Sequence, residues 1–133
     1  IGTCDSGNSG AYDQNIKMFV RCCLQSGRLP RVGLILGSGL AELAERIENA
    51  VVLSYQDLPG YPMTTVEGHV GRLVIGDWVG IHVACMQGRF HVYEGYDPAE
   101  LITPIRALQA AGCELLLVTC AAGSLESKCR QAA

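Results

Sequence analysis

The chain has 133 residues, of which 49% are hydrophobic and 17% are charged, and its formal net charge is −3. This composition supports one domain with an apolar core and is unlike that of a disordered chain. Without a basic stripe the sequence offers no electrostatic footprint for nucleic acid, and no apolar run reaches the ~18 residues that a membrane span needs.

The seven cysteines indicate free thiols rather than a disulfide framework. Their number is odd, no C-x-x-C pair occurs, and several lie in or beside apolar runs, as expected for a protein of the reducing cytoplasm. The three histidines, His69, His82 and His91, show no ligand spacing with the cysteines. We therefore predict no metal site.

The first predicted elements are a helix and a strand. Residues 1–10 have no basic segment followed by an apolar core, so we predict no signal peptide there, and we expect these residues to form a flexible lead. Apolar residues recur at helical spacing over residues 11–26, and Gly27 and Pro30 end this predicted helix. The continuous apolar run Val32 to Leu36 is typical of a strand that is covered on both faces.

A Gly37-Ser38-Gly39 turn leads from this strand into a second predicted helix, residues 40–47. Two interpretations stay open for it: a plain tight turn, or an anion site made of a hydroxyl and the amides of a helix N-terminus. It is not a Walker loop, because no lysine follows at the right spacing, and Glu42 interrupts a full G-x-G-x-x-G pattern.

The middle of the chain predicts short strands and one loop. A strand is expected at residues 51–53, and residues 57–68 form a loop marked by glycine and prolines, with His69 just after it. Residues 71–76 and 79–86 predict a hairpin that turns at Asp77-Trp78. Trp78 is expected to pack at this turn, and His82 to lie on the exposed face of its strand.

The stretch from Met86 to Tyr96 carries the densest chemistry of the sequence. Arg89 is a permanent planar cation suited to a phosphate or carboxylate, and His91 can exchange a proton near neutral pH. Tyr93 offers a flat face and a hydroxyl, as sugars and bases need. The alternative is a surface loop in which Arg89 pairs with Glu94.

A third helical region and a last strand follow. Asp97 is placed to cap a helix that starts at Pro98, while Pro104 must either kink this helix or start another one. Gly112 ends the helix, and residues 114–119 predict a strand that runs into the small-residue loop 121–124.

The predicted fold class is α/β, with a mainly parallel, twisted sheet, flanking helices and one hairpin. Three loops then follow the carboxyl ends of strands: residues 37–39, 87–95 and 121–124. Ligands of open α/β sheets bind at that edge, so the convergence of three such loops favours a binding site more than any single loop does.

These motifs resemble those of the trimeric, inosine- and guanosine-cleaving purine nucleoside phosphorylases. The resemblance runs from about Pro30 to Leu125, and four stretches carry it: residues 36–40 (LGSGL), 65–73 (TVEGHVGRL), 86–96 (MQGRFHVYEGY) and 118–123 (VTCAAG). It implies a nucleoside phosphorylase-like fold. It also implies a reaction in which orthophosphate attacks the anomeric carbon of a purine nucleoside, releasing the base and ribose 1-phosphate.

Site residues follow from the resemblance position by position. Four positions correspond to phosphate-binding groups: Ser38, His69, Arg89 and the backbone at Ala121. Tyr93 corresponds to a ribose contact, and His91, the expected catalytic residue, lies beside the phosphate and the sugar. The resemblance further implies no metal or organic cofactor, a homotrimer, and purine nucleoside and phosphate as the bound partners.

The sequence also departs from the family. Members are roughly twice as long, and their second half supplies the groups that bind the purine. We therefore expect residues 11–125 to be the N-terminal half of a nucleoside phosphorylase domain, followed by a divergent tail, 126–133. Ala41, Cys120 and Ser124 replace usual family residues. The alternative function is a catalytically incomplete phosphate-binding fragment or a subunit-association module; a generic nucleotide-binding module is disfavoured by the incomplete glycine pattern.

Overall fold

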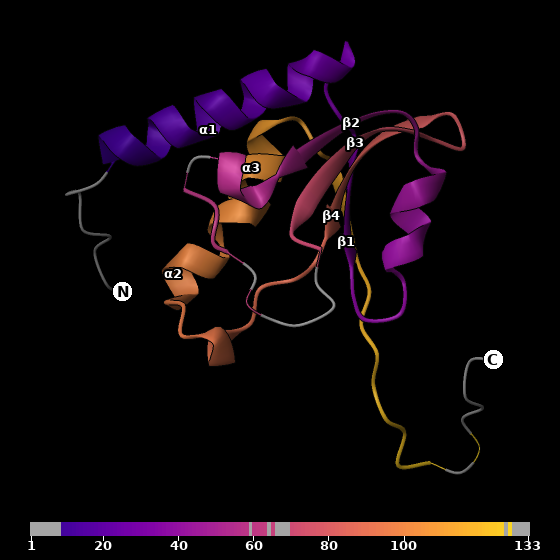
Figure 1. The fold of residues 1–133 in the computed structure, drawn as a ribbon. Helices are drawn as coiled ribbons and strands as arrows, with labels where there is room; N and C mark the ends of the chain where they lie inside the picture. The colour runs from indigo at the N-terminus through magenta and orange to yellow at the C-terminus, as the bar shows by residue number, and fades with distance from the viewer. Residues whose placement is uncertain (1–8, 59, 64, 66–69, 127, 129–133) are drawn as a thin grey trace.

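The structure, a computed structural model, describes residues 9–58, 60–63, 65, 70–126 and 128. One five-stranded sheet organises them, with helices on both sides (Figure 1). Its strands are β1 Val32–Leu36, β2 Glu48–Ser54, β3 Arg72–Trp78, β4 Ile81–Gln87 and β5 Leu115–Val118. The α-helices are α1 Ser9–Cys23, α2 Pro98–Leu101 and α3 Thr103–Ala110. Short 3-10 helices occur at η2 Leu24–Ser26, η3 Ala41–Arg46, η4 Tyr55–Asp57 and η5 Val92–Glu94.

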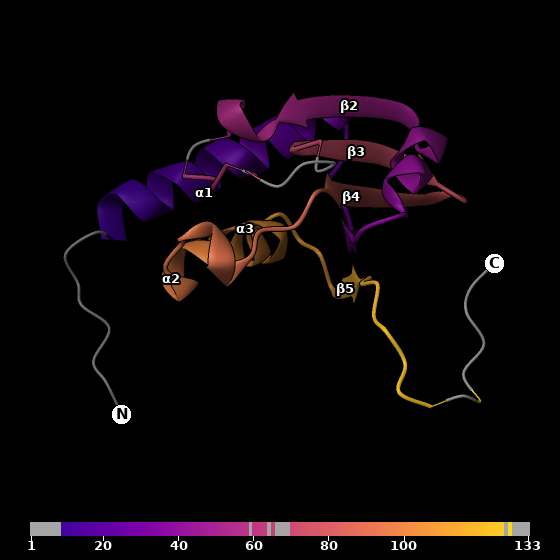
Figure 2. The ribbon, with the colours of Figure 1, turned by 60° about the horizontal axis from the view of Figure 1, so that its bottom comes forward.

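The strand order is β2-β3-β4-β1-β5, which confirms the α/β class. β1 pairs in parallel with β4 and with β5, whereas β2 with β3 and β3 with β4 are antiparallel. The sheet is thus mixed rather than mainly parallel, because β2 pairs antiparallel with β3 at the edge of the hairpin and does not join the parallel strands β4, β1 and β5. β5 forms one edge of the sheet and β2 the other (Figure 2).

The sheet buries a different apolar cluster on each face. The larger cluster joins Phe19 and Cys23 of α1 to Ala107 and Leu108 of α3 through sheet residues such as Ile75. The smaller one lies on the side of η3 and includes Leu34, Val74, Val83 and Ala44. Figure 2 shows the three α-helices on one side of the sheet and η3 on the other. Burial on both faces explains why the strand Val32 to Leu36 reads as a continuous apolar run.

The N-terminal helix agrees with its prediction, but the second predicted helix does not. α1 continues through η2 to Ser26, and Gly27 ends it in the left-handed region at φ 90°. The segment predicted as a helix at residues 40–47 is the 3-10 helix η3, in which Ala44 is the one buried residue. Most of the stability of an α-helix in a protein comes from packing of its apolar face, and a six-residue segment that buries one side chain lacks such a face.

The β3–β4 hairpin corrects two predictions. The chain turns at Val79 and Gly80, at φ 51° and 76°, rather than at Asp77-Trp78, and the register pairs Trp78 with Ile81. His82 is buried, with 6% of its surface exposed, rather than solvent-facing. Its Nδ1 lies 2.8 Å from Oδ1 of Asp77, and its Nε2 lies 2.8 Å from Oγ of Ser26. The end of the first helical region covers this side of β4, so the imidazole is enclosed between two polar partners. Trp78 packs against the smaller cluster, as predicted.

The C-terminal part follows the capping signals of the sequence. The Asp97 carboxylate accepts from the amide of Ala99 and Glu100 completes a capping box, so α2 begins at Pro98. Pro104 lies in the first turn of the separate helix α3, which settles the choice between a kink and a new start. β5 ends at Val118, so Thr119, which was predicted to end this strand, lies just beyond it. Most of the predicted lead and tail lies outside the described residues, which leave out 1–8, 127 and 129–133. Among the described helices, none is long and apolar enough to cross a membrane.

Candidate functional site

Three loops meet at the carboxyl edge of the parallel strands. β4, β1 and β5 run in the same direction side by side, so residues 37–40, 88–95 and 119–124 leave the sheet at one edge (Figure 1). The predicted convergence is therefore confirmed by the topology. Residues 37–40 are called the glycine loop below.

The glycine loop is joined to the end of β5 through Thr119. The amide of Gly37 donates to Oγ1 of Thr119 at 2.9 Å, and the Thr119 hydroxyl and amide both donate to the carbonyl of Ile35 at 3.2 and 3.0 Å. A Cβ on Gly37 would lie 2.6 Å from the carbonyl oxygen of Thr119, which leaves no room for any other residue. The first glycine of the loop is thus required by the approach of the neighbouring strand.

Arg89 also contacts the end of β5. Its Nη1 donates to the carbonyl oxygen of Thr119 at 3.5 Å, and its side chain is partly buried. It borders a pocket of about 230 Å³ with one charged lining residue, Arg89 itself, and otherwise apolar walls: Ile35, Met86, Phe90, Leu101, Pro104, Ile105 and Val118. A guanidinium beside apolar walls is poorly screened and attracts an anion more strongly than an exposed one does.

Aromatic side chains hold the backbone around Arg89. The Tyr55 hydroxyl donates to the carbonyl of Gly88 at 2.9 Å, and the Tyr55 and Phe90 rings lie 5.1 Å apart. The Tyr96 hydroxyl accepts from the amide of Met63 at 2.9 Å and donates to its carbonyl at 2.5 Å. Burial raises the pKa of Tyr55 well above its ordinary value, so its hydroxyl stays a donor. The loop therefore starts from a fixed scaffold, as preorganised sites require.

His91 and Tyr93 form a stacked pair at this edge. Their ring centroids lie 4.7 Å apart at an interplanar angle of 19°, and Tyr93 is 74% exposed. Nδ1 of His91 lies 3.1 Å from Oε1 of Glu94, which also accepts from the His91 amide at 2.8 Å. The carboxylate thus orients the imidazole and leaves a flat aromatic face open to a ligand.

Glu94 is a site residue whose role the sequence reasoning missed. Its side chain is 1% exposed, and its Oε2 accepts from both the amide and the hydroxyl of Thr65 at 2.9 Å. Burial acts to raise the pKa of this carboxyl, but the hydrogen bonds from Thr65 and His91 outweigh it and lower the pKa. The alternative loop interpretation had assigned Glu94 to Arg89; instead Glu94 joins the loop after β4 to the segment before β3.

Three further predicted site residues are Ser38, Ala121 and His69. Ser38 and Ala121 are exposed, each in the loop that follows its strand, at the same sheet edge as Arg89. His69 lies outside the described residues. Thr119 was predicted as the end of a strand and as part of the 118–123 stretch, but without a role of its own. Its contacts connect two of the loops.

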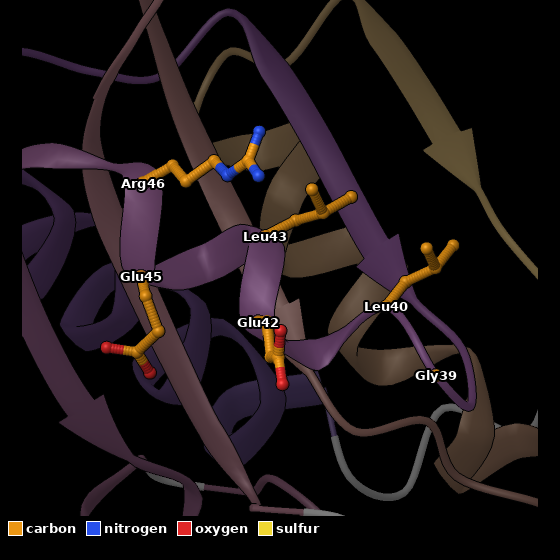
Figure 3. A pocket seen from close by; sticks show the side chains of 6 residues that line it. All are labelled: Gly39, Leu40, Glu42, Leu43, Glu45 and Arg46. Carbon is orange, nitrogen blue, oxygen red and sulfur yellow. The ribbon is translucent and has the colours of Figure 1, made fainter.

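A second hollow beside the glycine loop is a poor match for an anion. It measures about 370 Å³ and is lined by Gly39, Leu40, Glu42, Leu43, Glu45 and Arg46. Figure 3 shows the carboxylates of Glu42 and Glu45 extending from η3 away from Arg46. Because the Glu45 carboxylate is already paired with Arg72 and Glu42 lines the same hollow as Arg46, no excess positive charge favours a phosphate here, and the anion-binding potential lies on the Arg89 side.

Comparison with known proteins gives one consistent result. The family model described as "Phosphorylase superfamily" matches residues 31–131. Purine nucleoside phosphorylase 1 of Bacillus subtilis is 52% identical over 101 residues, which are 76% of this chain and 37% of that protein. Purine nucleoside phosphorylase of Mus musculus is 45% identical over 96 residues, 72% of this chain and 33% of that protein.

A solved structure gives the same picture. Isoform 2 of purine nucleoside phosphorylase from Schistosoma mansoni, crystallised with cytosine and ribose 1-phosphate, superposes with a TM-score of 0.77 at 42% identity. The match covers 86% of this chain and 41% of that chain. The chain thus spans well under half the length of the relatives it matches.

Proposed function

The chain belongs to the phosphorylase superfamily, and we propose that it supplies the phosphate- and ribose-binding part of a purine nucleoside phosphorylase. The proposed reaction is phosphate-dependent cleavage of the N-glycosidic bond of purine ribonucleosides or deoxyribonucleosides. Its products are the free base and ribose or deoxyribose 1-phosphate. The observation that carries the proposal is the convergence of the glycine loop, Arg89 and the end of β5 on Thr119.

The proposed roles follow from the chemistry of each group. Phosphate is a multiply charged nucleophile that must be held in line with the anomeric carbon, which positioning and electrostatics achieve. Arg89 would bind it as a planar cation, and Ser38 and the backbone at Ala121 would donate hydrogen bonds. His69 is proposed as a fourth phosphate contact on the family resemblance alone. His91 and Tyr93 would lie against the sugar, with Glu94 fixing the imidazole.

The bond changes need no cofactor. An oxygen of phosphate forms the bond to the anomeric carbon as the bond from that carbon to the purine nitrogen breaks. The positive charge that develops on the sugar ring is matched by the bound phosphate. The departing base takes a proton from solvent, and the hydrogen phosphate returns one to solvent as it becomes the sugar phosphate ester. Groups that would hold the purine are not assigned to this chain.

The test follows hypoxanthine release from inosine by the purified chain, with and without phosphate, together with phosphate binding by calorimetry. Phosphate-dependent release supports the enzyme. Phosphate binding without release supports the second candidate, a catalytically incomplete phosphate-binding fragment or subunit-association module. Absence of phosphate binding contradicts the enzyme and the phosphate-binding fragment, and leaves the subunit-association module as the supported reading.

The assignment of Arg89 has a charge-matched control. Hydrogen bonds to charged groups contribute about 1.5–3 kcal/mol, so Arg89→Ala is expected to weaken phosphate binding about 10- to 100-fold. Arg31→Ala removes the same charge from the opposite end of β1, where Arg31 pairs with the exposed Glu114. It should leave the phosphate affinity within about twofold, because exposed pairs contribute little. Equal effects of the two variants would contradict a specific role for Arg89.

We further propose that the protein is located in the cytoplasm and that it associates with other copies of itself. The free thiols favour the cytoplasm. Residues 115–118 of β5 are 38–61% exposed and form an apolar sheet edge, which supports association, as a homotrimer by the family resemblance. A monomer in sedimentation at micromolar concentration would count against association.

A further inference from the structure

Gln87 is buried next to the candidate site, yet the proposed reaction gives it no role. It ends β4, directly before Gly88 and Arg89, and 2% of its surface is exposed. In the sheet it pairs with Leu36, the last residue of β1, on one side and with Arg72 of β3 on the other. A buried polar side chain is costly unless its hydrogen bonds are satisfied, so its contacts indicate what it does.

Both ends of the Gln87 amide are used. Its Oε1 accepts from Nε of Arg72, and its Nε2 donates to the carbonyl oxygen of Ala41 at 2.5 Å. The chemistry fixes this orientation, because a guanidinium offers only donors and a carbonyl only an acceptor. Arg72 also binds the carboxylate of Glu45 through Nη2. One arginine and one amide thus connect the sheet to η3.

These contacts anchor the glycine loop at its far end. Thr119 holds the loop at Gly37, and Gln87 holds the first residue after it, Ala41. Apolar packing holds η3 on one side only, through the buried Ala44 and the partly buried Leu43. In Figure 3 Glu45 extends away from Leu40 and Leu43, so the Arg72 contact and the apolar contacts hold different sides of η3.

We propose that Gln87, oriented by Arg72, is a positioning residue that fixes the glycine loop and thereby sets the phosphate affinity. The inference rests on the proposed function for its ligand. Gln87 has no proposed contact with the phosphate; it acts through the Ala41 carbonyl on Ser38 and the backbone of the glycine loop. An apolar residue of similar length would fill the space but release the far end of the loop.

The first measurement is hydrogen exchange of the free chain, compared with Gln87→Met. Two amides report the loop and the start of η3: that of Leu40, which donates to Gly37, and that of Leu43, which donates to Leu40. Both should exchange faster in Q87M, while amides of β1 and β4 keep their protection. Unchanged exchange at Leu40 and Leu43 would overturn the proposal.

The second measurement is phosphate binding by calorimetry, with Ser26→Ala as the control. That variant removes a hydrogen bond to the buried His82 at the other end of β4. Q87M should weaken phosphate binding about tenfold, the effect of one lost backbone anchor, and S26A should leave it unchanged. Equal weakening by both variants would show general destabilisation and overturn the inference.

A double-mutant cycle separates positioning from mere folding. If Gln87 acts through the loop, Q87M should cost less phosphate affinity in a Ser38→Ala background than in the unmodified chain, because the two sites are coupled. Full additivity would contradict the inference. Absence of phosphate binding by the unmodified chain would contradict the proposed function instead, and the exchange experiment would still decide whether Gln87 fixes the loop.

Discussion

Replacing Gly37 with alanine tests the closest approach in the candidate site. The added Cβ would lie 2.6 Å from the Thr119 carbonyl oxygen and 3.1 Å from Cα of Cys120. Both are backbone atoms, so no side-chain rotation relieves the contact, and the end of β1 or of β5 must move. Overpacking of this kind costs about 1–3 kcal/mol. The shift would also lengthen the 2.9 Å hydrogen bond from the Gly37 amide to Thr119.

The expected change can be converted into a melting temperature. An unfolding entropy of about 2.1 cal/mol/K per residue gives roughly 0.28 kcal/mol/K for 133 residues. The cost therefore corresponds to a decrease of about 4–11 °C in Tm, measured by circular dichroism and checked by urea unfolding. Gly123→Ala is the matched control, because its Cβ would meet no atom within 4 Å. It should shift the free energy of unfolding by less than about 0.5 kcal/mol.

An unchanged Tm for Gly37→Ala would refute the reasoning, since it would mean that β1 and β5 do not approach this closely in solution. Equal losses in both variants would also refute it, because they would reflect a general intolerance of alanine at this edge. Reduced stability with a normal Gly123→Ala variant supports the geometry of the loops.

Three further predictions concern other parts of the fold. Tyr55→Phe leaves the buried Gly88 carbonyl without its donor and should cost about 1–3 kcal/mol in urea unfolding; no loss would exclude that bond. Hydrogen bonds from His82 and Arg28 lower the pKa of Asp77 from 3.8 to about 2, so its stabilisation is complete above pH 4 and lost as the pH falls toward 2. Asp77→Asn should flatten this part of the Tm-versus-pH profile, and an identical profile would contradict the pairing. Val79→Asn should stabilise by about 1 kcal/mol, because a β-branched residue at φ 51° is strained; a lower Tm would argue against this turn.

Local signals in the sequence determined several elements correctly. The run Val32 to Leu36 is a strand because continuous β-branched and aliphatic residues suit a sheet covered on both faces. Asp97 caps a helix whose first residue is Pro98, because a carboxylate can accept from the free amides there and proline lacks one. The order of three loops after three strands also predicted the shared edge of the candidate site.

Other features depended on partners that lie far away in the sequence. His82 is buried because the end of the N-terminal helical region covers that side of β4 and brings Ser26 to it. The hairpin turns at Val79, against the preference of a β-branched residue, because the pairing of β3 with β4 fixes the register over seven residue pairs. The β2–β3 pairing adds a second antiparallel pair to the predicted hairpin, so that two of the four strand pairs are antiparallel. The short run predicted at residues 51–53 carried no sign of its direction.

The sequence by itself therefore determined the family and the α/β class, and it predicted the chemical groups of the candidate site. Tertiary structure alone decided how these groups are held: Glu94 between His91 and Thr65, Thr119 between two loops, and Gln87 between Arg72 and Ala41. The physical reason is that motifs report residue types and local backbone preference, whereas a buried hydrogen bond depends on which distant group the fold brings within about 3 Å.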